Sequence, residues 1–174
     1  MNYSKEKHSH NFAIWAAARA TQRAFTSTEN LKKALEDCGI LDFIKNPDKA
    51  SEFDNLHKKW CNSICKDLKK EGINKVTYGR AAKLVNCYLK SRLVLKNLES
   101  EEAYYIHPPI DRILLQNLSK SETISKEKKK WLKGINWTQL NMEEYFRLIN
   151  FLRKFNGDKP FWMIERHWKP AGNT

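Results

Sequence analysis

The sequence has almost none of the patterns that form β-structure. No segment alternates Val or Ile with polar residues between turn signals, and no Asn-Gly or Asp-Gly pair joins two such segments as a hairpin. Internal repeats at the periods of solenoid proteins are absent as well. Helical patterns fill nearly the whole chain, so we expect an all-α fold: a single compact domain of about seven to eight helices over residues 1–174.

The sequence also lacks the segments that direct a chain into or across a membrane. Its first ten residues, MNYSKEKHSH, are polar and contain no apolar core of a signal peptide. It has no run of about 18 apolar residues that would span a bilayer. We therefore expect a cytoplasmic protein without membrane association, with its four cysteines reduced and residues 1–9 flexible.

Several common catalytic motifs are missing. There is no Gly-x-x-x-x-Gly-Lys-Ser/Thr loop of a P-loop NTPase and no Gly-x-Ser-x-Gly elbow. A zinc site is an alternative, because His57, Cys61 and Cys65 recur every four residues and Cys38 or Cys87 would complete the ligands. Cysteine more often packs as a small apolar residue, and no Cys-x-x-Cys pair is present. We expect no metal and no cofactor.

Acidic residues are few relative to basic ones. The chain has 32 Lys and Arg against 20 Asp and Glu, which gives a formal net charge of +12. Such an excess attracts polyanions, and nucleic acid is the commonest of them because each neutralised phosphate releases counterions. We therefore expect nucleic acid, and DNA in particular, as the partner.

Capping residues and glycines predict where the helices begin and end. Thr77 and Asn141 are candidate N-caps, and Gly39, Gly72 and Gly157 are candidate stops. The expected helices cover residues 11–25, 31–38, 49–71, 78–98, 110–118, 125–133, 142–155 and 161–168.

Two segments carry candidate chemistry. In YGRAAKLVNCYLK (residues 78–90), Lys83 falls beside the apolar face of the helix, where burial disfavours the ammonium and favours a free amine for Schiff-base chemistry. In IHPPIDRILLQNL (residues 106–118), Asp111 stands in the first turn of a helix and stays ionised there. His107 precedes the prolines and is a candidate acid, base or phosphate contact. The structural alternatives are a lysine with a solvated ammonium and a capping aspartate.

Other residues are candidates for binding nucleic acid. The stretch KEKKKWLK contributes Lys126, Lys128, Lys129 and Lys130 around an aromatic ring, a combination typical of backbone-binding surfaces and also of a solvated helix face. Tyr104 and Tyr105 lie in a predicted loop and are candidates for stacking on bases. Arg19 and Arg23 are spaced by one helical turn and would clamp a phosphate.

These segments carry a resemblance. Together with HNFAIWAAARATQR (residues 10–23), they look like a group of small helical bacterial proteins without an assigned activity. The order of a glycine, a helix and then "ID" before another helix is also similar to the helix-hairpin-helix DNA glycosylases. That resemblance implies a catalytic Asp111, a nucleophilic Lys83, and phosphate contacts from Gly79 and Arg80, although the chain has a single glycine where the family has a Gly-rich hairpin.

The sequence thus predicts a DNA-directed protein of helix-hairpin-helix glycosylase type, one that cleaves the base–sugar bond of a damaged or modified nucleotide and has lyase chemistry at Lys83. The alternative is a non-catalytic module that binds nucleic acid or another protein, for example in a bacterial stress or defence system.

Overall fold

The computed structural model describes residues 3–47 and 52–170, and in these ranges every regular element is a helix, which confirms the all-α fold. None of these helices is both long and apolar enough to cross a membrane. The elements follow in order α1 (Lys5–Thr21), α2 (Thr28–Asp37), α3 (Ile40–Lys45), α4 (Phe53–Lys70), α5 (Tyr78–Arg92), η2 (Val94–Lys96), α6 (Glu101–Tyr105), α7 (Arg112–Leu118), α8 (Lys126–Gly134), η3 (Trp137–Gln139), α9 (Met142–Asn156) and η4 (Phe161–His167).

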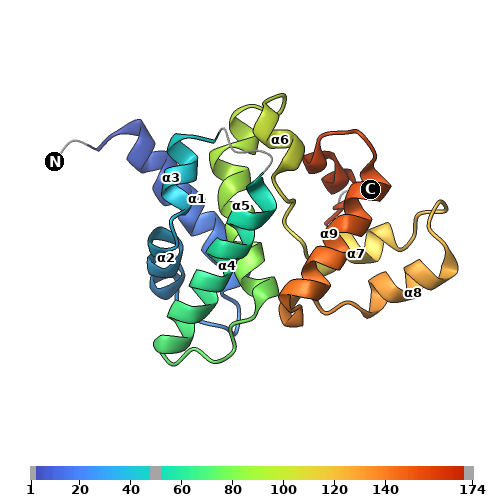
Figure 1. The fold of residues 1–174 in the computed structure, drawn as a ribbon, viewed down its shortest axis with the longest axis horizontal. Coiled ribbons are helices and arrows are strands. Elements are labelled where there is room, and N and C mark those ends of the chain that lie inside the picture. The colour runs from blue at the N-terminus through green and yellow to red at the C-terminus, as the bar shows by residue number, and fades with distance from the viewer. Residues whose placement is uncertain (1–2, 48–51, 171–174) are drawn as a thin grey trace.

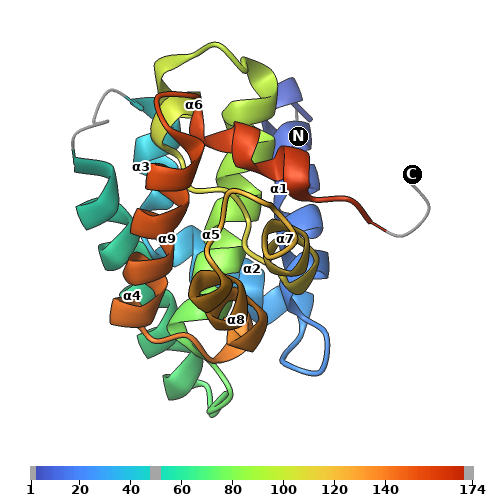
Figure 2. The same cartoon turned by 90° about the vertical axis from the view of Figure 1, so that its right-hand side faces the viewer.

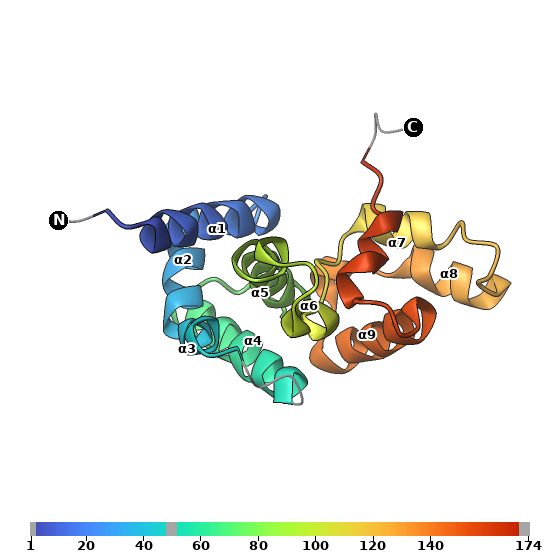
Figure 3. The same ribbon diagram turned by 90° about the horizontal axis from the view of Figure 1, so that it is seen from above.

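Helix α5 is the centre of the fold. Figure 3 shows α1 and α4 on opposite sides of α5, and the C-terminal helices beyond it. Turned by 90°, the molecule presents α7, α8 and α9 to the viewer (Figure 2). Most of the side chains of α5 are buried, including the polar Lys83, Asn86 and Arg92. Lys83, Asn86 and one terminal nitrogen of Arg92 each have a partner on another element, whereas Nε of Arg80 and the other terminal nitrogen of Arg92 are buried without a hydrogen bond.

Most of the described helices begin at a side-chain cap, and the predicted caps Thr77 and Asn141 are confirmed. Ser27 caps α2, Thr77 caps α5 and Ser125 caps α8. Asn141 and Glu144 form a capping box at the start of α9, in which each side chain accepts the backbone N–H of the other. These caps satisfy N–H groups that have no partner within the helix.

The N-terminal segment differs from expectation. Helix α1 begins at Lys5, inside the stretch predicted to be flexible, and Ser4 caps it. His10 explains the extension, because its ring hydrogen-bonds Tyr88 of α5 at 2.8 Å and Glu36 of α2 at 2.8 Å. Glu6 pairs with the buried Arg92. Contacts across three helices thus hold a segment that is polar in sequence.

Other helix boundaries also differ from the prediction. The helix predicted to run to residue 98 ends at Arg92, and η2 follows it. Tyr104 and Tyr105, expected in a loop, lie in α6, which Ser100 caps. The start of the predicted helix over residues 49–71 falls partly outside the described residues. The final helix, expected to be α, is the 3-10 helix η4.

Helix α7 starts two residues later than expected, and this changes the role of Asp111. The backbone of Asp111 is extended (φ −147°, ψ 176°), so this residue is the N-cap and not a first-turn residue. Pro108 and Pro109 lie outside the helix, in the stretch that joins α6 to α7. A cap of this kind fixes the carboxylate at the helix end.

Gly79 is the point of closest approach between α5 and η3. Its N–H donates to the Leu140 carbonyl at 2.9 Å, and the Thr77 hydroxyl donates to the Thr138 carbonyl at 2.7 Å. A Cβ added at Gly79 would lie 2.0 Å from the carbonyl oxygen of Trp137. Only glycine lets the backbones of α5 and η3 approach this closely.

A buried hydrogen-bonded network joins α4, α5 and α9 to the segment before α7. Asn86 donates to the Tyr145 hydroxyl at 2.9 Å and to the Pro108 carbonyl at 3.1 Å, and its Oδ1 lies 3.0 Å from Nε2 of His57. Tyr145 also meets Nδ1 of His107 at 3.0 Å. Every member of this core has a partner, as buried polar groups require.

The network extends to the surface at Asp54. Nε2 of His107 lies 2.9 Å from Oδ1 of Asp54, and Arg153 donates to both carboxylate oxygens at 2.6 and 2.7 Å. In His57, Nε2–H donates to Asn86 and Nδ1 accepts the Tyr78 O–H. In His107, Nδ1 accepts the Tyr145 O–H, and Nε2 lies between the Asp54 carboxylate and Nη2 of Arg153, which is 3.0 Å away. The charge of Arg153 beside this ring favours its neutral form.

The pKa shifts of the network agree with neutral rings. Burial lowers the pKa of His107 to about 4, although the hydrogen bond to Asp54 opposes the shift. Burial also holds the pKa of His57 well below its ordinary value, helped by His107. Burial alone would raise the pKa of Asp54, but the hydrogen bonds from Arg153 and His107 outweigh it and hold that pKa well below its ordinary range.

The Gly79 contact gives the first prediction. We expect Gly79→Ala to lower the free energy of unfolding by about 1–3 kcal/mol, because the new Cβ forces α5 away from η3. Urea unfolding followed by tryptophan fluorescence measures the change. Gly134→Ala is the matched control, since a Cβ there meets nothing within 4 Å and the fold should keep its stability. Equal effects of the two substitutions would contradict the prediction.

The histidines give the second prediction. Their pKa values are lower in the fold than in the unfolded chain, so the unfolded chain binds more protons as the pH falls below about 6.5. Stability is full above that pH and declines towards pH 4, by at most about 1.4 kcal/mol per pH unit for each histidine. Urea unfolding at a series of pH values tests this. His107→Gln should show a shallower decline, and an unchanged slope would refute the assignment.

Candidate functional site

The structure brings the two predicted catalytic residues together. Nζ of Lys83, in the second turn of α5, lies 3.2 Å from Oδ2 of Asp111, the N-cap of α7. The Lys83 side chain is 8% exposed and the Asp111 side chain is 21% exposed. They form an ion pair that is mostly shielded from water yet still reachable.

Asp111 is held by three donors. Its Oδ1 accepts the N–H of Leu114 at 2.9 Å, while Oδ2 accepts the indole N–H of Trp168 at 2.8 Å as well as the Lys83 ammonium. The network behind it adds support, because Asn86 holds the carbonyl of Pro108 three residues earlier. The carboxylate is thereby fixed in one orientation toward the lysine.

A pocket of about 430 Å³ opens over this pair, which is within the range of ligand sites. We call it the Lys83 pocket. Ala16 and Ala20 of α1 form one wall, and the rings of Trp137 and Trp168 form others. The Lys83 ammonium lies 5.7 Å from the centre of the Trp137 ring, a cation–π distance. Aromatic walls around a charged pair favour a flat ligand that places a reactive carbon near the lysine.

A second ion pair lies in the same pocket. Lys90, two turns after Lys83 on α5, pairs with Glu165 of η4. Burial raises the pKa of Glu165, against the opposing effect of the Lys90 charge. Burial also raises the pKa of the Cys87 thiol, which lines the pocket between the two lysines. Glu165 is thus a further carboxyl group of the pocket whose pKa lies above its ordinary value.

The arrangement suits a lysine nucleophile. An ammonium must lose a proton before its nitrogen can attack, and Asp111 lies within hydrogen-bond reach to accept it. Because Leu114 and Trp168 fix the carboxylate, this acceptor is already oriented. An amine, a carboxylate within its hydrogen-bond reach and the groups that orient that carboxylate therefore lie together at one pocket.

Three residues expected to contact nucleic acid have other roles. Gly79 is buried beneath the Trp137 carbonyl and is closed to a phosphate. His107 is fully buried in the central network. The Arg80 guanidinium stacks on the Phe25 ring at 4.6 Å. The first two are therefore corrected to structural residues, since no ligand reaches a fully enclosed group.

The remaining candidates are on the surface, with one exception. Arg19 and Arg23 are exposed on α1 and just after it, and Tyr104 is 52% exposed. Tyr105 is half-buried, donates to the Pro47 carbonyl at 2.8 Å and packs on Phe53, so it anchors α6. On α8, Lys126, Lys128 and Lys130 are exposed and Lys129 is half-buried.

The zinc alternative has no support in the geometry. Both ring nitrogens of His57 hydrogen-bond Tyr78 and Asn86, and Cys61 is fully buried. Over the ranges that the structure describes, no group of three or more His, Cys, Asp or Glu side chains is placed to hold a metal ion. The four cysteines are free thiols.

Sequence reasoning missed Trp137, Glu165 and Trp168. Trp137 lies in η3, Glu165 in η4 and Trp168 directly after η4, between 54 and 85 residues from Lys83 along the chain, and no local motif surrounds them. Lys90 could have been found, because seven residues separate it from Lys83 and a helix returns to the same face after two turns.

Comparison of the chain with protein-family models, with curated proteins and with solved structures finds no match. The site therefore has to be judged on its own geometry.

The ion pair gives a prediction of its own. Asp111→Ala removes the cap of α7 and leaves a buried ammonium without a partner, so we expect a loss of about 3–5 kcal/mol in the free energy of unfolding. Lys83→Met should cost less, because Asp111 keeps the N–H groups of Leu114 and Trp168. Urea unfolding compares the two variants. A larger loss in Lys83→Met would contradict this account of the pair.

Proposed function

We propose that the protein is a DNA-directed enzyme that cleaves the base–sugar bond of a damaged or modified nucleotide, with Lys83 as nucleophile and Asp111 as its base. The observation that carries the proposal is the 3.2 Å pairing of Lys83 with Asp111 in a pocket with two tryptophan walls. Such a pocket offers an extruded base surfaces to stack on while the sugar carbon meets the amine.

The reaction follows from the order of the groups. Asp111 takes a proton from the Lys83 ammonium, and the free amine attacks C1′ of the nucleotide. The C1′–base bond breaks, and the base leaves with the electron pair and takes the proton from Asp111. The C1′–O4′ bond then opens, a proton passes from the lysine nitrogen to O4′, and Lys83 remains joined to C1′ as a Schiff base.

The surface around the pocket supports a nucleic-acid substrate. Phe12 and Trp15, on the turn of α1 before the pocket wall, are 58% and 55% exposed with their ring centres 5.9 Å apart. Arg19 is exposed on the next turn. Exposed aromatic side chains stack on or wedge between bases, and a nucleotide leaves its helix more easily when a side chain takes its place. The net charge of +12 draws the polyanion in.

Borohydride trapping tests the proposal. The protein would be incubated with single strands and duplexes that carry abasic sites or a panel of damaged bases, and then reduced. We expect a covalent protein–DNA adduct that is lost in Lys83→Ala. Asp111→Asn should keep the fold and the affinity for DNA but release base at least about a hundredfold more slowly.

Lys59→Ala is the matched control, because Lys59 is exposed on α4, on the far side of α5 from the Lys83 pocket. This variant should form the adduct like the unmodified protein. An adduct that persists in Lys83→Ala, or no adduct and no base release from any substrate, would overturn the proposal.

A non-catalytic nucleic-acid-binding module is the second candidate. The basic, aromatic surface of α8 favours it, because that surface needs no chemistry at Lys83. For such a module, charge reversal at Lys128, Lys129 and Lys130 abolishes binding and Asp111→Asn changes nothing.

A further inference from the structure

We infer that a groove between α8 and α9 binds an unpaired nucleotide of single-stranded DNA by stacking it against Trp131. Only the class of partner rests on the proposed function, since the groove uses none of the residues of the Lys83 pocket. It has a volume of about 720 Å³, and ten residues line it, among them Trp131, Gly134, Asn136, Gln139, Glu144 and Arg147.

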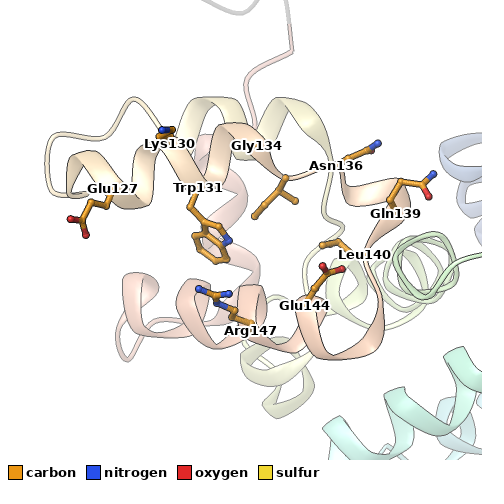
Figure 4. Close-up of a pocket in the computed structure, with 10 residues that line it drawn as sticks. Glu127, Lys130, Trp131, Gly134, Asn136, Gln139, Leu140, Glu144 and Arg147 are labelled. Atoms are coloured by element: carbon orange, nitrogen blue, oxygen red, sulfur yellow. The ribbon is translucent and has the colours of Figure 1, made fainter.

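The groove is closed on three sides. Figure 4 shows α8 above it, α9 below it and η3 between them, with the Trp131 indole directed at Arg147 on the facing helix. Glu144 and Leu140 lie on the η3 side of the indole, and Asn136 and Gln139 stand at the rim. Carboxylate and amide groups beside an aromatic ring are the groups that read the edge of a base.

Cations are fixed around the same ring. Nζ of Lys128 lies 5.0 Å from the centre of the Trp131 ring, and the Arg147 guanidinium carbon lies 5.5 Å from it. Phe151 packs edge-on against Trp131 at 5.3 Å. A base that stacks on Trp131 takes the place of one of these cations over the ring. The displaced cation is left beside the base, where it can pair with the phosphate of the same nucleotide.

The charge continues beyond the groove. An adjoining depression shares Glu144 and Arg147 with it and is also lined by Lys58, Lys128 and Lys154. Nζ of Lys58 lies 4.7 Å from the centre of the Phe146 ring of α9. This is a further pairing of a cation with an aromatic ring on the same helix. Alternation of rings and cations along one surface is how proteins follow a single strand of nucleic acid.

The shape favours an unpaired base over a duplex. A base held in a Watson–Crick pair cannot enter a cavity that three helices enclose, whereas a base on a flexible strand can turn into it. Element η3 also separates this groove from the Lys83 pocket, with Trp137 on the pocket side and Asn136 and Gln139 on the groove side. A single strand of DNA can therefore reach both cavities by passing over η3.

The test uses undamaged DNA, so that it does not depend on catalysis. Fluorescence anisotropy would measure binding of a labelled oligothymidylate, alone and annealed to oligoadenylate. We expect Trp131→Leu to weaken binding of the single strand about tenfold and that of the duplex by less than about twofold. Equal affinities of Trp131→Leu and the unmodified protein for the single strand would overturn the inference.

Two further variants keep the test sound if Trp131→Leu fails to fold. Gly134 lines the groove, and a Cβ there meets nothing within 4 Å. We expect the larger side chain of Gly134→Leu to narrow the groove and to weaken single-strand binding to a similar degree. Lys128→Glu should weaken binding and reduce its salt dependence. Lys59→Glu is the control with the same charge change on α4, and a loss as large as that in Lys128→Glu would overturn the inference.

Repeating the titration with Lys83→Ala separates the two proposals. Binding that depends on Trp131 and survives in Lys83→Ala supports the groove whatever the trapping experiment gives. A trapped adduct together with unchanged binding in Trp131→Leu and Gly134→Leu would leave the enzyme proposal standing and overturn this inference alone.

Discussion

The hydrogen bonds of one buried amide, that of Asn86, determine how the segments of this fold meet. From the middle of the central helix α5, this side chain contacts His57 of α4, Tyr145 of α9 and the backbone of Pro108. Each of these groups would be costly to bury alone, so the helices are held in the one arrangement that satisfies them all. Apolar packing alone permits several close alternatives, whereas a saturated polar network does not.

The same network also fixes the positions of the two residues of the site. Asp111 follows Pro108 by three residues and takes its position from the cap of α7 in front and from the Asn86 contact behind. Lys83 lies three residues before Asn86 on α5. The lysine and the aspartate are therefore attached to one rigid unit, and their separation does not depend on a mobile loop. A reactive pair needs this kind of support, because small displacements weaken proton transfer and attack.

The local features of this chain could be predicted from sequence, and the spatial ones could not. Thr77 and Asn141 act through neighbours three residues away, so their capping could be predicted from the sequence alone. Lys83 and Asp111 are candidate site residues on local patterns, but their contact could not be predicted, because 28 residues and two helices separate them. The prediction that Gly79 and His107 belong to a binding surface was wrong, because exposure depends on the packing of elements that are distant in the sequence. Glu165 and Trp168 have no local signal, and they reach the pocket only because η4 folds back across α7.

The close contact at Gly79 has a consequence for the spacing of the two cavities. Backbone atoms of α5 and η3 touch there, and η3 is the partition between the Lys83 pocket and the groove beneath Trp131. Because that contact is made by backbone atoms, the position of η3 relative to α5 does not depend on side-chain rotamers. For the proposed DNA substrate, the position of η3 would set how much of the strand lies between a nucleotide in the Lys83 pocket and one in the groove.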